Sequence, residues 1–209
     1  MASPLDIPRY SYETLRKRAD NFLRTYNPKA TIPVPIEEII EFQFRMDIIP
    51  IPGLHQGYEV DGFISSDLSA ISVDLFVYES RPGRYRFTLA HELGHAVLHR
   101  RVYEAAAFST IKEWKRFVAE IDIQDYEWLE WQAYAFAGLI LVPPVSLRKK
   151  LSDAVSRADA SGLSVRKAGD VARQYVSAWL AKEFEVSSPV IEKRLDKDKL
   201  WPVKDEPGT

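Results

Sequence analysis

The pattern of apolar and polar positions divides the chain into a helical start, a strand-rich segment and a long helical second half. Leu15, Ala19 and Phe22 recur at three- and four-residue steps, which predicts a helix over residues 10–26. A second, shorter amphipathic helix is predicted at residues 36–44. Short apolar runs bounded by turn residues then predict three strands, at residues 47–51, 60–64 and 70–78.

The second half of the chain follows a helical period almost throughout. Pro143 and Pro144 must end its most apolar helix, because proline lacks the amide donor and clashes with the preceding turn. Helices, three strands and more helices predict an α+β fold with one small mixed sheet. The predicted helices are residues 85–101, 110–120, 128–142, 146–157, 165–184 and 188–195. The predicted units are a core at residues 1–145, a helical C-terminal appendage at 146–197 and a flexible tail at 198–209.

Length and composition narrow the possible functions. The 209 residues suit one domain, or one domain with a small appendage. The net charge of −2 gives no global basic field, so direct nucleic-acid binding is not expected. The longest apolar run, residues 133–142, is too short to span a membrane, and the amino terminus lacks the pattern of a secretory signal. We therefore expect a cytoplasmic protein without a membrane segment.

The segment His91-Glu92-Leu93-Gly94-His95 is the main candidate for chemistry. Residues four apart lie on the same face of a helix, so His91 and His95 can bind one cation, and Zn²⁺ is the usual ion at such sites. Glu92 lies about 100° around the helix, where it can act as the general base of a zinc peptidase. The chain has no cysteine, so any zinc site must use histidine or carboxylate ligands.

A catalytic zinc needs three protein ligands, and the predicted third ligand is Glu130. It lies in the apolar helix at residues 128–142, where a carboxylate is costly to bury unless it is paired or bound to a metal. The alternative is that Glu130 lies in the first turn of this helix and faces water. Asp122, Asp125 and Glu127 are weaker candidates, and Asp125 fits better as a helix N-cap.

Other histidines and tyrosines have two possible interpretations each. His99 can support a ligand histidine or, as we favour, pack and cap near the end of its helix. His55 lies in a Gly-rich loop and is expected at the surface. Tyr85, Tyr103 and Tyr134 can each supply a proton donor to a tetrahedral oxyanion, or serve only in aromatic packing.

Longer motifs around these residues resemble one peptidase family. Residues 84–99, RYRFTLAHELGHAVLH, resemble the R-x-R-F-T-L-A-H-E-L-G-H-x-x-L-H signature of the ImmA/IrrE metallopeptidases. Residues 130–137, EWQAYAFA, resemble the E-x-x-A-N-x-F-A segment of that family. Residues 61–64 and 70–73 resemble its D-G-x-I turn and edge strand, and residues 180–187 resemble its L-A-x-x-F-x-V-S ending.

The resemblance implies a zincin-like fold in which His91, His95 and Glu130 bind Zn²⁺ and Glu92 is the base. Studied members cleave helix-turn-helix repressors of the Cro/CI type and thereby activate mobile-element or stress-response genes. Such a repressor is therefore the expected protein substrate. The chain departs from the family at Tyr134, where asparagine is usual and where related zincins orient a ligand histidine.

The carboxy-terminal segment has the spacing of a helix-turn-helix, with Ala181, Val186 and Ile191 as predicted buried positions. Glu185 stands at the turn where glycine is usual, which costs energy if its φ is positive. The second helix is mixed in charge, so we interpret the segment as structural or partner-contacting.

Two other functions stay open at this stage. One is a regulatory module that keeps the zincin fold and binds a repressor or DNA without cleavage. The other is a metal hydrolase that acts on a non-peptide amide. For the peptidase, we expect the substrate to lie extended along an exposed strand at residues 70–78.

Overall fold

The structure is a computed structural model that describes residues 7–108 and 110–201. It contains a three-stranded sheet in an otherwise helical chain, so the predicted α+β class is confirmed. Within these residues, no helix is both long and apolar enough to cross a membrane. The elements are α1 (Tyr12–Tyr26), α2 (Ile36–Glu38), the π-helical turn η1 (Ile39–Phe44), β1 (Asp47–Ile51), α3 (Leu54–Tyr58), β2 (Gly62–Ile64), β3 (Ala70–Asp74), α4 (Leu75–Ser80), α5 (Pro82–Leu98), α6 (Arg100–Ala106), α7 (Ile111–Glu120), α8 (Ile123–Leu141), α9 (Pro144–Ala160), α10 (Val165–Phe184) and α11 (Ser188–Lys197).

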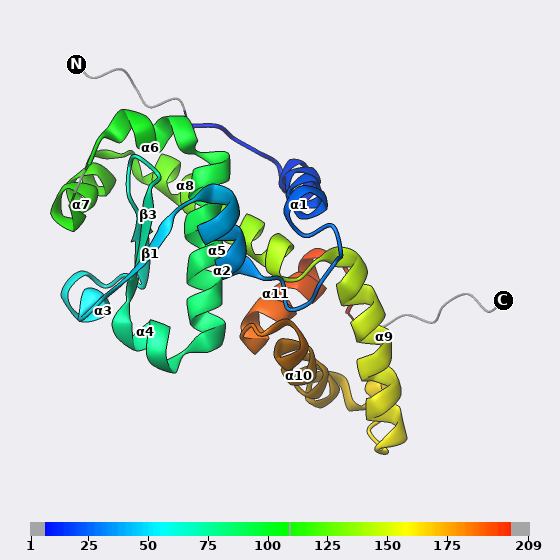
Figure 1. Ribbon diagram of the computed structural model, residues 1–209. Coiled ribbons are helices and arrows are strands. Elements are labelled where there is room, and N and C mark those ends of the chain that lie inside the picture. Colours follow the sequence, from blue (N-terminus) through cyan, green and yellow to red (C-terminus); the bar gives the residue numbers. More distant parts are fainter. Residues whose placement is uncertain (1–6, 109, 202–209) are drawn as a thin grey trace.

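Helices α5 and α8 form the centre of the molecule. The sheet and helices α3, α4, α6 and α7 lie on one side of this pair, and α1, α9, α10 and α11 lie on the other (Figure 1). Helix α5 packs against α8 and also against β2 and β3. It is therefore the element through which the sheet and the helical second half are joined.

The sheet has the order β1-β3-β2, with β1 parallel and β2 antiparallel to β3, which confirms a small mixed sheet. Because β3 is paired on both sides, the prediction that residues 70–78 form an exposed strand was wrong. The strand ends at Asp74, whose side chain accepts hydrogen bonds from the backbone amides of Phe76 and Val77. This N-cap starts α4 where an extended chain was expected.

Capping also explains where α8 begins. Asp122 is its N-cap and accepts hydrogen bonds from the amides of Gln124 and Asp125, so the assignment of the cap to Asp125 was wrong. Asp125 lies in the first turn and pairs with Arg9 at 2.6 Å. The helix is five residues longer at its start than the predicted 128–142, and this extra length adds a full turn before Glu130.

A close approach between α5 and α8 fixes their relative position. A Cβ atom added to Gly94 would lie 3.2 Å from the carbonyl oxygen of Ala133 and 3.3 Å from its Cα atom. Both are backbone atoms, which cannot rotate away as a long side chain can. Gly94, at the centre of the His-Glu-Leu-Gly-His segment, therefore lets the two backbones pack against each other.

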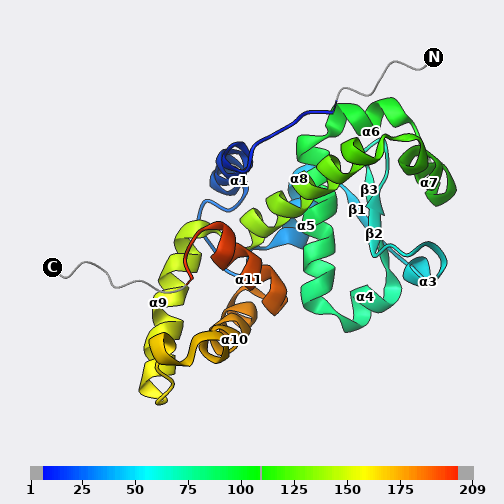
Figure 2. The ribbon, with the colours of Figure 1, turned by 180° about the vertical axis from the view of Figure 1, so that it is seen from behind.

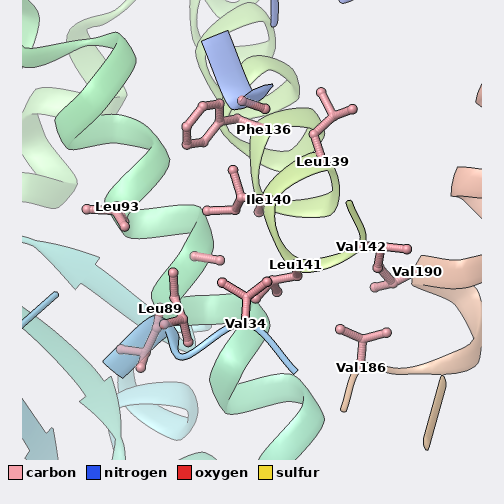
Figure 3. Packing of buried hydrophobic residues seen from close by; sticks show 14 of the residues in the cluster. Val34, Leu89, Leu93, Phe136, Leu139, Ile140, Leu141, Val142, Val186 and Val190 are labelled. Atoms are coloured by element: carbon pink, nitrogen blue, oxygen red, sulfur yellow. The ribbon is translucent and has the colours of Figure 1, made fainter. Parts of the chain in front are cut away.

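The predicted C-terminal appendage shares its core with the rest of the chain. Val186 and Val190 pack beside Val142, just beyond the end of α8, in the main hydrophobic cluster (Figure 3). The guanidinium of Arg194, which is 3% exposed, donates a hydrogen bond to the Val142 carbonyl at 3.2 Å. The division at residue 145 stays a prediction, and the two parts are in continuous apolar contact across it.

The helix-turn-helix spacing at the carboxy-terminal end has the expected burial. Ala181 and Val186 are each 7% exposed and Ile191 is fully buried, as predicted. Glu185 has a φ of 51°, so this turn does place a non-glycine residue in the left-handed region.

The start of the predicted flexible tail is held in place. The Asp198 side chain is 1% exposed, accepts a hydrogen bond from Arg16 at 2.6 Å and pairs with Arg194 at 2.8 Å. The Leu200 amide also donates to the Leu195 carbonyl at 2.8 Å. Residues 198–201 thus contact the body of the protein, and the rest of the predicted tail, 202–209, lies outside the described residues.

Replacing Gly94 by alanine tests the helix contact. The added methyl group would push α8 away from α5, and we expect the free energy of unfolding to fall by about 1–3 kcal/mol. Chemical denaturation measures this change. Gly57→Ala in α3 is the control, because its Cβ would have no atom within 4 Å. The control should be neutral or slightly stabilising, and an equal loss in both variants would contradict the proposed contact.

Candidate metal centre

The two histidines of the candidate site come from one face of α5. Pro82 occupies the first turn of this helix and His99 is its C-cap, so His91 and His95 both lie well inside it. Their Nε2 atoms are 3.1 Å apart, and their rings are 4.8 Å apart between centroids. The four-residue spacing therefore brings the two imidazole nitrogens to one point, as predicted.

Glu130 comes to the same point from α8. One carboxylate oxygen lies 3.2 Å from Nε2 of His91 and the other lies 3.4 Å from Nε2 of His95. Of the two interpretations of Glu130, the geometry favours the ligand over the water-facing residue. Of the weaker candidates, Asp122 caps α8, Asp125 pairs with Arg9, and Glu127 is exposed.

The pKa values of Glu130 and His91 depend on the contacts that these groups make with each other. Burial alone would raise the pKa of Glu130, but the hydrogen bonds from His91 and His95 outweigh it and hold the pKa well below the usual range. Burial lowers the pKa of His91, whereas the hydrogen bond and charge of Glu130 raise it, and the net shift is upward. An anionic carboxylate facing two imidazoles is a favourable arrangement for a cation.

The spacing of the donor atoms fits a four-coordinate metal ion. Two nitrogens and a carboxylate oxygen lie within 4.8 Å of one another. The nitrogens are 3.1 Å apart, and the two oxygens of Glu130 lie 3.2 Å from His91 and 3.4 Å from His95. Ligands of a tetrahedral zinc at about 2.0–2.1 Å lie roughly 3.3 Å from one another. The residues present could therefore hold a divalent ion with little rearrangement.

Glu92 lies beside this cluster and is 7% exposed. Burial raises its pKa, while His91 and His95 oppose that rise and a hydrogen bond from the Ile64 backbone lowers it. Strand β2 can approach α5 here because residue 62 is glycine. A Cβ on Gly62 would lie 2.7 Å from Cγ2 of Thr88 and 2.8 Å from the carbonyl oxygen of Ser72.

His99 is the C-cap of α5 and also contacts the ring nitrogen of His95 that lies away from Glu130. Its Nδ1 lies 3.1 Å from Nδ1 of His95, and burial lowers the pKa of His99 to about 2, so its ring is neutral. If Nε2 of His95 points its lone pair at a cation, the proton of His95 is on Nδ1 and is donated to His99. The Nε2 of His99 is buried and has no hydrogen-bond partner among the described residues.

A cleft of about 530 Å³ contains the candidate ligands and Glu92. Tyr103, Tyr126 and Tyr134 line it, whereas Tyr85 packs against Tyr78 outside it. Tyr126 was not among the tyrosines predicted for the site, although its position four residues before Glu130 on one helix could have indicated it. Burial, and then the charge of Glu130, raises the pKa of Tyr126, and burial does the same for Tyr103.

Tyr134 has a different environment from the one expected of a residue that orients a histidine. Its hydroxyl accepts a hydrogen bond from Nζ of Lys193 at 3.0 Å, and its ring lies 4.7 Å from that of Phe87. His55 is half exposed and lies 3.0 Å from Asp61, away from the three candidate ligands.

A mixed sheet packed on a His-Glu-x-x-His helix, with a glutamate supplied by a second helix, defines a zincin-like metallopeptidase fold. A family model described as the IrrE N-terminal-like domain, of the peptidase M78 family, matches residues 75–196. The chain belongs to this family, so the resemblance inferred from the motifs is confirmed.

The fold is also similar to that of part of a larger protein. A transcriptional regulator from Mycobacterium tuberculosis is similar in structure, with a TM-score of 0.53 and 14% sequence identity. The match covers 90% of this chain and 47% of the regulator, so the chain spans about half of that protein's length. At this identity the likeness concerns the fold alone. No match is found among curated proteins.

The metal centre predicts a specific pattern of ion binding. Metal-free protein titrated with Zn²⁺ should bind one equivalent in calorimetry, and Glu130→Gln should weaken binding by at least about 100-fold, since a charged ligand is lost. Glu127→Gln, an exposed glutamate on the same helix, is the matched control and should bind as the unaltered protein does. Equal binding by all three proteins would rule out Glu130 as a ligand.

Proposed function

We propose that the protein is a zinc-dependent endopeptidase. In this proposal His91, His95 and Glu130 hold the ion and Glu92 is the general base. The observation that carries it is the convergence of the three donor atoms beside Glu92, a buried glutamate on the helix that supplies the two histidines. The absence of cysteine and the presence of two imidazole ligands with one carboxylate support zinc as the ion.

The proposed reaction divides the chemistry between the ion and the chain. When bound, zinc supplies a Lewis acid that polarises the scissile carbonyl and lowers the pKa of the attacking water. A carboxylate oxygen of Glu92 accepts a proton from this water as the water oxygen adds to the carbonyl carbon. Glu92 then gives the proton to the amine nitrogen as the C–N bond breaks. The raised pKa of Glu92 suits a group that both accepts and returns a proton.

Two tyrosines are candidates to stabilise the oxyanion. Tyr103 and Tyr126 both line the cleft beside the candidate ligands, and the pKa of each is raised, so each keeps its hydroxyl proton. Tyr103 also packs its ring 5.1 Å from that of His95. A hydroxyl donor in this position would favour a developing negative charge over the neutral carbonyl.

The substrate backbone would bind at β2 and not at residues 70–78. The Asp61 carbonyl accepts a hydrogen bond from the Asp74 amide, and the Ser65 amide donates to the Ala70 carbonyl. The backbone amides and carbonyls of odd-numbered residues in this segment therefore point towards β3. By the alternation of an antiparallel pair, the backbone groups of Gly62 and Ile64 face away from β3. The Ile64 backbone already donates a hydrogen bond to Glu92, so the backbone of Gly62 is the part of this edge that a peptide would use. Gly62 also lines the cleft, so an extended peptide could add to this edge as a further strand.

A helix-turn-helix repressor of the Cro/CI type is the proposed substrate. Support comes from the resemblance of residues 84–99 and 130–137 to the ImmA/IrrE peptidases, whose studied members cut such repressors. We propose that cleavage would derepress mobile-element or stress-response genes.

A regulatory module that binds a repressor or DNA without cutting it is the second candidate. Two features favour it. Helices α10 and α11 have the spacing of a helix-turn-helix. Position 134, where asparagine is usual in the family, is a tyrosine that contacts Lys193. Binding of DNA is the weaker form of this candidate, because α11 carries Glu192 and Asp196 as well as Lys193 and Lys197.

Co-expression with the repressor encoded nearest to its gene tests the function. The proposal predicts a repressor fragment with a new terminus by mass spectrometry, and Glu92→Gln should slow its formation by about 10²–10⁴-fold while zinc stays bound. Glu104→Gln is the control, because Glu104 is exposed and pairs with Arg100. A tight complex with bound zinc and an intact repressor would support the regulatory module instead.

A further inference from the structure

A second cavity adjoins the cleft of the metal centre. It has a volume of about 350 Å³ and shares three lining residues with the cleft, namely Phe87, Tyr134 and Val190. Its other walls include Trp131, Ala135 and Gly138 of α8. Helix α11, which packs against α8 (Figure 2), closes it with Val190 and Lys193. The cavity is called the Tyr134 pocket below.

The position of the Tyr134 pocket along α8 places it within reach of a bound peptide. Tyr134 and Ala135 follow Glu130 by four and five residues, which is about 6–7.5 Å along the helix axis at 1.5 Å per residue. An extended peptide advances about 3.3 Å per residue. A substrate side chain one or two residues from the scissile bond could therefore enter the pocket.

Aromatic contacts hold the walls of the Tyr134 pocket. The rings of Phe87 and Tyr134 are 4.7 Å apart, and Nζ of Lys193 lies 4.2 Å from the centre of the Tyr134 ring. Trp131 is stacked on Trp128 with a centroid distance of 4.7 Å. These contacts limit the motion of the walls, so the pocket is available before a ligand binds.

The chemistry of the lining selects one class of occupant. The lining residues from α5 and α8 are aromatic or small and offer few partners to a polar group; they are Phe87, Trp131, Tyr134, Ala135 and Gly138. Helix α11 contributes three basic side chains and one acidic side chain to the lining, namely Lys193, Arg194, Lys197 and Asp196. Their net positive charge would repel a basic side chain. A volume of about 350 Å³ accommodates a large aliphatic or aromatic side chain.

We propose that the Tyr134 pocket is a specificity subsite for a large apolar side chain of the substrate, next to the scissile bond. This inference rests on the proposed peptidase function. It gives Tyr134 a role as a wall of the subsite, in place of the histidine-orienting role of the family asparagine. It also makes α11 part of the substrate-binding surface.

Binding of peptide hydroxamates tests the subsite without measuring catalysis. The hydroxamate group chelates zinc, and a single side chain is varied as glycine, leucine, phenylalanine or lysine, on either side of the chelating group. Calorimetry on the zinc-loaded protein should show, in one of the two series, leucine or phenylalanine binding about 10- to 100-fold tighter than glycine. Lysine should show no such gain.

Two pocket variants and one control locate the preference. Ala135→Trp should fill the pocket and reduce the gain of leucine or phenylalanine over glycine to less than about threefold, while zinc affinity is unchanged. Trp131→Ala removes a wall and should also reduce this gain. Ala160→Trp, at an exposed position in α9, should leave the preference as it is in the unaltered protein.

The possible results separate this inference from the function on which it rests. Hydroxamates that bind with equal affinity whatever their side chain would overturn the subsite alone. A preference that survives in both pocket variants would also overturn it. Failure of the protein to bind zinc, or to bind any hydroxamate, would contradict both the subsite and the proposed function.

Discussion

Helices α5 and α8 pack with their backbones in direct contact, and the sheet and α1 pack on this pair. Gly94 allows the backbones to meet at Ala133. The same approach brings Glu130, one turn before Ala133 on α8, to His91 and His95 on α5. A side chain at position 94 would separate the helices that supply the two halves of the candidate metal centre. The small residue between the two histidines is thus as much a part of the site as the donors themselves.

The same two helices connect the site to both sides of the molecule. Towards the sheet, Gly62 lets β2 lie against α5, where the Ile64 backbone contacts Glu92. Towards the second half, Val190 of α11 lines both the cleft and the Tyr134 pocket, and Lys193 lines the pocket. The predicted appendage is therefore close enough to the metal centre to shape what binds there, and its apolar contact with Val142 stabilises that position (Figure 3).

Features with local causes were predictable from the sequence, and features with distant partners were not. Helical periodicity explains the spacing of His91 and His95 and the burial of Val186 and Ile191. This pattern can be recognised within one short segment of the chain, without knowledge of distant contacts. The strand at residues 70–78 was predicted too long because Asp74 caps a helix from within an apolar run. The environment of Tyr134 includes Lys193, 59 residues later in the chain, and no local pattern indicates that contact.

Anomalous diffraction from crystals of the zinc-loaded protein tests the central claim most directly. We expect one strong zinc peak between α5 and α8, at about 2.0–2.2 Å from Nε2 of His91, Nε2 of His95 and a carboxylate oxygen of Glu130. Glu92 should lie near the ion without ligating it. A peak held by other residues, or a zinc-loaded structure in which Glu130 points to solvent, would contradict the account.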